Sequence, residues 1–232
     1  MPAGRKRAEE PPAKGATAEE APARRARSKR AARGYHHGDL KRVLVEAGLA
    51  LLEEGGVEAV RVREAARRAG VSPAAPFRHF PSREEFLRAV ALAGIERFQL
   101  ASAAEVAAAP SPLLRFRALG LASVRFALEH PALFELLNGP AFRGDPEGAR
   151  ALLAAADEAR SRLQKMLEEA RAGGELRPTD PVVTEVAGRA LAYGLARMFL
   201  DGHLPREGAM ELTAAVLDVL GEGLATRRPD PG

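Results

Sequence analysis

The chain has 232 residues, of which 46% are hydrophobic, and a formal net charge of +4 at pH 7. Because it contains no cysteine, it can form neither disulfides nor thiolate metal sites, which is typical of a reducing compartment. The sequence has no apolar run of membrane-spanning length and no apolar segment near its charged, proline-rich N-terminus, so we expect a cytoplasmic protein without a membrane span or secretory signal.

Positive charge is concentrated at the front of the chain. Residues 1–34 carry ten Lys and Arg against four Glu, and residues 35–90 carry nine basic against eight acidic side chains. Residues 91–232 carry sixteen basic and nineteen acidic side chains. A basic front predicts a polyanionic partner there, and a different partner for the rest of the chain.

Residues 1–34 consist largely of Ala, Pro, Glu, Lys and Arg. They can bury too little apolar surface to offset the entropy of ordering, so we interpret them as a disordered basic arm. The arm either adds to DNA affinity by releasing counterions or serves as a solubilising tail. It contains no Leu, Ile, Val, Phe or Trp, which disfavours insertion into a membrane.

Apolar residues recur at helical spacing after residue 34. A first helix is predicted by the stripe Leu40, Val43, Leu44, Ala47 and Leu51. The pair Gly55-Gly56 ends this helix. A second, short helix covers residues 62–69, and Gly70 ends it because glycine readily adopts the left-handed conformation found after many helices.

A third short helix follows closely. Ser72 can cap it and Pro73 suits its first position, so we predict a helix from residue 73 to about Phe80. The run Ser82-Arg83-Glu84-Glu85 is a capping box that opens a fourth helix. Two short helices joined by a tight turn are typical of a DNA-binding helix-turn-helix. A packed helical hairpin remains the alternative on spacing alone.

The remainder is also predicted to be helical, because Val and Ile do not alternate with polar residues as in strands. Polar residues that precede Pro mark helix starts at Ser111, His130, Asp145 and Asp180. The predicted helices cover residues 112–129, 131–138, 146–172, 181–201 and 207–224. The expected fold is all-α, with a basic arm (1–34), a helix-turn-helix domain (35–82), a helical regulatory and dimerisation domain (83–226) and a tail (227–232).

The segment from residue 35 to residue 90 resembles the TetR/AcrR family of regulators, through the runs VREAARRAGVS from Val62 and FRHF from Phe77. The lead-in YHHGDL from Tyr35 is similar to that of one branch of the family, and the C-terminal part is similar in helix number and length. The resemblance implies a ligand-responsive transcription factor, a repressor, that binds a palindromic operator in double-stranded DNA as a homodimer. The sequence leaves open whether ligand releases or promotes DNA binding.

The resemblance also implies that Arg63 lies near DNA at the start of the second helix and that Arg83 holds a phosphate. Arg78 and His79 can donate to base edges or phosphates, because both carry N–H groups. The full set expected at DNA is His37, Arg63, Ser72, Ala74, Ala75, Phe77, Arg78, His79 and Arg83.

The predicted recognition helix is poor in long polar side chains. Ala74 and Ala75 can contact thymine methyl groups, whereas Phe77 stands where many family members carry Tyr and lacks a hydroxyl for phosphate. DNA shape is therefore expected to add to specificity.

Catalytic and metal-binding motifs are missing from the sequence. It has no glycine-rich phosphate loop, no HExxH and no GxSxG. His36 and His37 are adjacent, so their side chains point apart, and a DNA-backbone or helix-capping role is favoured over metal binding. His130 and His203 are interpreted as local helix-end residues. We expect no enzymatic activity, cofactor or metal.

The C-terminal helices carry more apolar surface than bracing the DNA-binding domain requires. The resemblance implies a pocket between the middle helices for an unidentified effector, whose binding would tilt the fourth helix. The candidate lining residues are Phe98, Phe116, Phe126, Phe134, Met166, Tyr193 and Met198. Such stripes are also typical of plain core, and that alternative stays open for each residue.

The last two predicted helices are apolar on more than one side, so they need burial against their own domain and against a second surface. The resemblance supplies an identical pair from a second subunit, forming a four-helix interface. Gly188 and Gly194 are expected to permit close approach. The predicted interface residues are Val186, Ala190, Gly194, Val216, Leu217 and Leu220.

Two other classes of function remain. A DNA-coating protein would show affinity that depends on salt but hardly on sequence, whereas an operator-binding protein keeps its preference as salt is raised. A helical module whose arm docks on an anionic membrane would depend on electrostatics alone.

Overall fold

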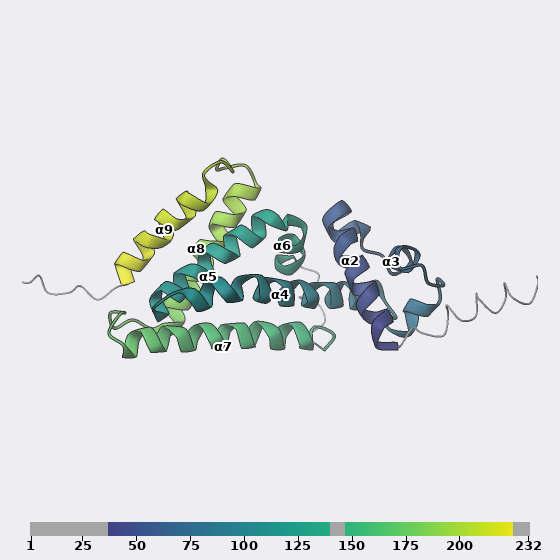
Figure 1. The fold of residues 1–232 in the computed structure, drawn as a ribbon, viewed down its shortest axis with the longest axis horizontal. Helices are drawn as coiled ribbons and strands as arrows, with labels where there is room; N and C mark the ends of the chain where they lie inside the picture. The colour runs from purple at the N-terminus through teal and green to yellow at the C-terminus, as the bar shows by residue number, and fades with distance from the viewer. Residues whose placement is uncertain (1–36, 140–146, 225–232) are drawn as a thin grey trace, which may run out of the picture. The chain divides into compact units, whose positions relative to one another are not determined.

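The computed structural model describes residues 37–139 and 147–224, so the predicted arm and tail lie outside the described residues. The elements are α2 (His37–Ala59), α3 (Val62–Arg68), the 3-10 helix η1 (Ala75–Arg78), α4 (Arg83–Ala108), α5 (Pro112–Glu129), α6 (Pro131–Asn138), α7 (Arg150–Ala172), α8 (Pro181–Leu200) and α9 (Ala209–Leu224) (Figure 1). The described residues contain helices and no strand, which confirms the all-α prediction. The chain divides after Leu40, and the packing described below lies within the unit from Lys41 onward.

Several helix starts lie where the capping residues predict them. Ser82 accepts a hydrogen bond from the Glu85 amide at 3.1 Å, and Asp180 accepts one from the Val182 amide at 2.8 Å. Ser111 caps α5 in the same way. These bonds satisfy amide groups that a helix start leaves without an intrahelical partner.

Other boundaries differ from the prediction by a few residues. The backbone is non-helical at Gly55 and Gly56, so the predicted break is confirmed, but a further helical turn follows it to Ala59. α7 begins at Arg150, after a turn at residues 147–149, and the predicted start at residue 146 lies outside the described residues. α9 begins after Gly208, whose φ of +69° is incompatible with a continuing helix.

The helix predicted from residue 73 to about Phe80 is shorter in the structure and is not an α-helix. Helical structure there covers Ala75–Arg78 and is of the 3-10 type, with no side-chain cap from Ser72. Pro76 explains the difference, because it has no N–H to donate to the carbonyl four residues earlier. The amide of Ala75 instead bonds to the Ser72 carbonyl at 3.1 Å, the i to i−3 pattern of a 3-10 turn.

The turn after α3 depends on Gly70, which has a φ of +67°. The Val71 amide donates to the Ala66 carbonyl at 3.1 Å, and the Gly70 amide donates to the Arg67 carbonyl at 3.2 Å. This pair of bonds is the Schellman motif, in which a left-handed residue ends a helix and satisfies its last carbonyls. The turn fixes the direction in which the chain enters η1.

Substituting Gly70 with Ala is expected to lower the free energy of unfolding by about 1–2 kcal/mol, because a Cβ is strained in the left-handed region. Urea unfolding followed by circular dichroism measures this. Gly221→Ala is the matched control: it lies inside α9 with open space around it, so the substitution should stabilise the helix by about 0.5–1 kcal/mol. A Gly70→Ala protein as stable as the wild type would contradict the role of the turn.

α2 and α4 pack closely and form the core of the N-terminal helices. A Cβ at Gly48 would overlap the side chains of Phe86 and Val90, so glycine is required there by packing. Phe86, Val90 and Leu52 are fully buried. The start of α4 therefore belongs to this core. The rest of α4 packs against α5, α6 and α7, which together with α8 and α9 form a second group of helices.

α5 lies in the middle of that second group and packs against α4, α6, α7, α8 and α9 (Figure 1). A Cβ at Gly94 of α4 would overlap Leu133 of α6, and a Cβ at Gly188 of α8 would overlap the ring of Phe116. These close approaches hold the helices around a cavity. No helix in the described ranges combines the length and apolarity needed to cross a bilayer.

Candidate DNA-binding surface and effector pocket

Most residues predicted to meet DNA are accessible. Exposed side chains are those of Arg63, Ser72, Ala74, Phe77 and Arg78, and partly buried ones are those of Ala75, His79 and Arg83. His37 begins α2, but its side chain lies outside the described ones. Phe77 is 40% exposed in the part of the chain that the structure describes, whereas large apolar rings are more often buried.

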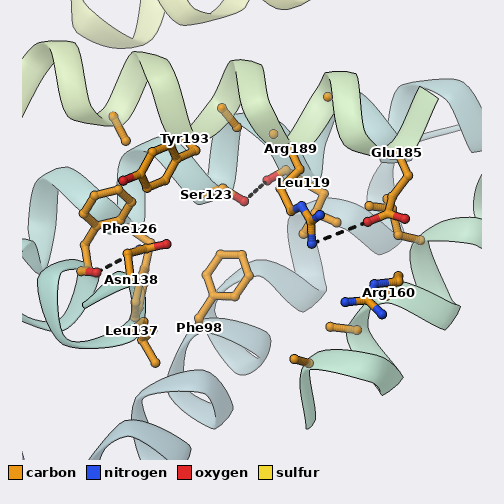
Figure 2. Close-up of a pocket in the computed structure, with 18 of the residues that line it drawn as sticks. Phe98, Leu119, Ser123, Phe126, Leu137, Asn138, Arg160, Glu185, Arg189 and Tyr193 are labelled. Atoms are coloured by element: carbon orange, nitrogen blue, oxygen red, sulfur yellow. Dashed lines mark hydrogen bonds and ion pairs between the residues drawn. The ribbon is translucent and has the colours of Figure 1, made fainter. Parts of the chain in front are cut away.

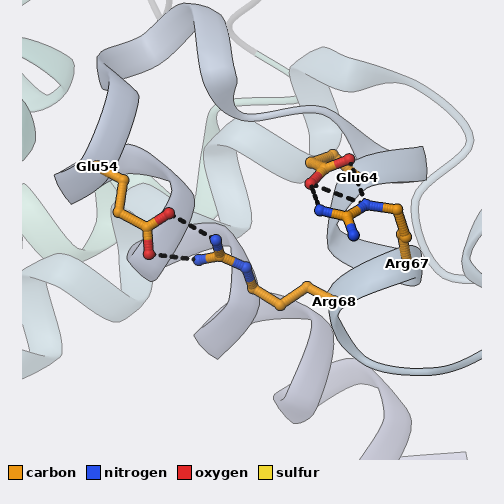
Figure 3. A network of polar contacts seen from close by, with 4 residues as sticks. All are labelled: Glu54, Glu64, Arg67 and Arg68. Atoms are coloured by element: carbon orange, nitrogen blue, oxygen red, sulfur yellow. Dashed lines mark hydrogen bonds and ion pairs between the residues drawn. The ribbon is translucent and has the colours of Figure 1, made fainter.

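Two arginines of α3 are paired with carboxylates. Arg67 donates to Glu64 at 2.5–3.2 Å, and Arg68 donates to Glu54 of α2 at 2.5 and 2.8 Å (Figure 3). These hydrogen bonds lower the pKa of both Glu64 and Glu54 and raise the pKa of each arginine. Both pairs are therefore charged at neutral pH, and their guanidinium groups are engaged within the protein.

Arg83 holds the end of α2 to the start of α4. Its side chain donates to the carbonyls of Val60 and Val57 at 3.0 and 2.6 Å, and to Glu58 at 3.3 Å. Sequence reasoning missed this role because the partners lie 23 to 26 residues away. The phosphate contact of Arg83 stays a prediction.

Arg63 and Arg78 differ from these three arginines. Both are exposed, and neither makes a hydrogen bond or ion pair with another residue that the structure describes. An unpaired exposed guanidinium carries a full charge and five N–H donors. These two side chains are thus available for an external anion.

A cavity of about 390 Å³ lies among the helices of the second group. Five of the seven predicted pocket residues line it: Phe98, Phe116, Phe126, Phe134 and Tyr193. Met166 and Met198 do not line it, and Met198 is 41% exposed on α8. Helical spacing alone could not show on which side of its helix each methionine lies.

Aromatic rings from four helices meet at the cavity (Figure 2). The centroids of Phe98 and Phe126 are 5.2 Å apart in an edge-on arrangement, and those of Phe134 and Tyr193 are 5.5 Å apart and stacked. Such pairs pack favourably. They form an apolar wall that spans α4, α5, α6 and α8.

The polar side chains of the cavity were missed by the sequence reasoning. Glu185 is 2% exposed and has Gln164 and Arg189 as partners. Arg160 from α7 and Ser123 from α5 also line the cavity. The sequence did contain a sign of this buried group, a single Glu among the Val and Ala residues at the start of α8. Charged residues are rarely buried unless they are paired, so a Glu in an apolar helix indicates a specific role.

A chain of contacts joins the aromatic wall to α2. The rings of Phe126 and His130 are 4.6 Å apart, and His130 Nδ1 lies 3.1 Å from a carboxylate oxygen of Glu53. The same Glu53 carboxylate accepts from Arg97 of α4 at 3.1 Å, and Arg97 also lies 3.5 Å from Glu46. His130 is thus more than the local helix-end residue expected from the sequence.

The predicted dimer surface is only partly exposed in the subunit. Val186 is 46% exposed, Ala190 is exposed and Gly194 faces open space. Val216 and Leu220 are half-buried against their own core clusters.

Two residues predicted for this surface lie inside the subunit instead. Leu217 is 5% exposed, lines the cavity and lies against Gly120 of α5, so it belongs to the subunit core. Gly188 accommodates the ring of Phe116 within the subunit. Both lie on the inner faces of their helices. The exposed large apolar residues of α8 and α9 are Val182, Val183, Val186, Tyr193, Met198, Leu212 and Val219.

Two family models match the chain: "Bacterial regulatory proteins, tetR family" over residues 44–90, and "Tetracyclin repressor-like, C-terminal domain" over residues 116–220. A solved structure of a protein of unknown function from Rhodococcus sp. RHA1 is 34% identical with a TM-score of 0.74, and the match covers 84% of this chain and 100% of that one. No curated protein matches the chain.

Two further solved structures share the fold. A TetR/AcrR-family transcriptional regulator from Thermobifida fusca YX-ER1 is 24% identical with a TM-score of 0.64, over 82% of this chain and 100% of that one. The ketosteroid transcriptional regulator KstR2 of Mycobacterium tuberculosis is 21% identical with a TM-score of 0.59, over 81% and 95%. The chain belongs to the TetR/AcrR family of DNA-binding transcriptional regulators.

Proposed function

We propose that this protein is a ligand-responsive, sequence-specific repressor that binds a palindromic operator as a cytoplasmic homodimer. The observation that carries the proposal is that Arg63 and Arg78 are exposed and unpaired among the described residues, whereas the neighbouring arginines are paired within the protein. Guanidinium groups kept exposed and unpaired on a helix-turn-helix suit contacts to phosphates and base edges.

Exposed apolar residues on the last two helices support dimerisation. On α8 they recur at Val182, Val186 and Tyr193, and on α9 they include Leu212 and Val219. A stripe of this kind is costly to leave in water. Two copies related by a two-fold axis would bury it as a four-helix interface. The two DNA-binding domains could then meet successive major grooves about 34 Å apart.

The effector would act through the aromatic wall. A ligand in the cavity contacts Phe98 of α4 and Phe126 of α5. The ring of Phe126 contacts the ring of His130, which lies within hydrogen-bond distance of Glu53 on α2. A ligand that prefers one arrangement of these helices shifts the spacing of the two DNA-binding domains. Weakening operator binding by one to two orders of magnitude requires about 1.4–2.8 kcal/mol of coupling.

Glu53→Gln is expected to reduce this coupling by about threefold to thirtyfold, because neutral Gln no longer pairs with His130 and Arg97. The coupling is the ratio of operator dissociation constants with and without saturating effector, measured by fluorescence anisotropy. Glu84→Gln, which removes an exposed charge from α4, should leave the ratio unchanged. An unaltered ratio in Glu53→Gln would exclude this route.

Selection of bound sequences from a random duplex pool at about 150 mM salt tests the proposed function. The purified protein should enrich an inverted repeat, and the Arg78→Ala, His79→Ala double variant should lose that enrichment. Salt-sensitive binding without any enriched sequence would contradict the proposal and indicate a DNA-coating protein.

A further inference from the structure

One acidic side chain in the cavity wall is buried without strong partners. Glu185 is 2% exposed, yet one carboxylate oxygen lies 3.3 Å from the Gln164 amide nitrogen and the other lies 3.6 Å from an Arg189 nitrogen. Both distances are long for charge-assisted hydrogen bonds. A carboxylate has about four acceptor positions, so Glu185 retains acceptor capacity toward the cavity that it lines.

Burial gives this carboxylate a strong electrostatic influence on the cavity, because little water screens it. Removing a charge from water is costly unless cations or donors replace the lost solvation. In the close-up, Glu185 lies at one end of the cavity, and Phe126 and Tyr193 lie toward the other (Figure 2). A ligand that carries a hydrogen-bond donor or a cation at one end of an apolar body would complement both ends of the cavity.

The two arginines that line the cavity are weaker determinants of ligand charge. The side chains of Arg160 and Arg189 are 45% and 59% exposed, and each already has an acidic partner, Asp157 at 3.0 Å and Glu185 at 3.6 Å. Coulomb interactions of such solvated groups are roughly fourfold weaker than those of groups in a partly buried environment. An anionic head group at Arg189 would also lie beside the buried carboxylate.

The aromatic wall favours the same ligand charge. Electron-rich ring faces attract cations, and five aromatic side chains line the cavity. Its volume of about 390 Å³ is in the range of small-molecule sites. We infer that the effector is an amphipathic amine, with its protonated nitrogen at Glu185 and an apolar body against the rings. This inference rests on the proposed function, because it names the ligand class of the proposed effector site.

Three probes with one apolar body test the inference: phenylbutylamine, phenylbutanol and phenylbutanoate, which are cationic, neutral and anionic at neutral pH. Calorimetric titration of the full-length protein should show the amine binding about tenfold to a hundredfold more tightly than the other two, as expected for a charge-assisted bond. Glu185→Gln should abolish this advantage. Glu158→Gln, which removes an exposed charge outside the cavity, should keep it.

Tighter binding of phenylbutanoate, or a preference for the amine that survives in Glu185→Gln, would overturn the inference, as would failure of the amine to bind. Circular dichroism checks that Glu185→Gln is folded. If it is not, the order of the affinities of the three probes for the wild-type protein tests the inference. Binding to the selected operator is measured on the same samples. Retained operator binding without amine binding refutes the ligand class alone, whereas loss of sequence-specific DNA binding refutes the proposed function whatever the probes do.

Discussion

The double substitution Arg63→Ala, Arg78→Ala is expected to weaken binding to the selected operator by about a hundredfold or more. Each guanidinium contact to a base edge or phosphate contributes about 1–3 kcal/mol, and neither side chain is engaged by another described residue of the protein. Fluorescence anisotropy at constant salt measures the loss. The slope of log affinity against log salt should become shallower by about one for each phosphate contact removed.

Arg67→Ala is the control for that prediction. Like Arg63, Arg67 is an exposed arginine of α3, but it is paired with Glu64. Its removal should therefore change operator affinity only slightly. If Arg67→Ala weakened binding as much as the double substitution, net charge rather than specific contact would explain the effect. Unchanged affinity in the double variant would remove both arginines from the DNA-binding surface.

Val186→Glu is expected to convert the proposed dimer into monomers, with a rise of at least about a thousandfold in the dimer dissociation constant. A two-fold interface contains each residue twice, so one substitution places two carboxylates in an apolar contact. Val186 is 46% exposed in the subunit, so the fold itself should tolerate the change. Analytical ultracentrifugation measures the association, and operator affinity should fall with it.

Leu100→Glu supplies the matched control, because Leu100 is 79% exposed on α4, away from the last two helices. This variant should remain dimeric. A dimeric Val186→Glu protein would show that the exposed stripe of α8 is not the interface.

Local chemistry explains which parts of the fold could be predicted from sequence. The starts of α4 and α8 follow from Ser82 and Asp180, whose caps involve residues two or three positions away. At residues 73–80 the Ser72-Pro73 start predicts a longer helix than the structure has, because the second proline, Pro76, cannot donate the hydrogen bond that an α-helix needs there.

Features that depend on tertiary packing could not be predicted in this way. Periodicity identifies α9 as apolar on several sides, but it does not show that Leu217 faces the cavity while Val219 faces outward. The contact of His130 with Glu53 joins residues 77 positions apart. Pairing of this kind has no local signature, and so the sequence predicted aromatic residues of the cavity but not the polar groups that line it.

The claim that two subunits bind two half-sites of one operator is tested most directly by changing the half-site spacing. Duplexes carrying the selected inverted repeat, with and without about five added central base pairs, differ by half a helical turn. We predict that one dimer binds the native spacing and that the insertion weakens binding by at least about a hundredfold, to the level of a single half-site. Equal affinity for both duplexes would contradict the account, because independent subunits have no preferred spacing.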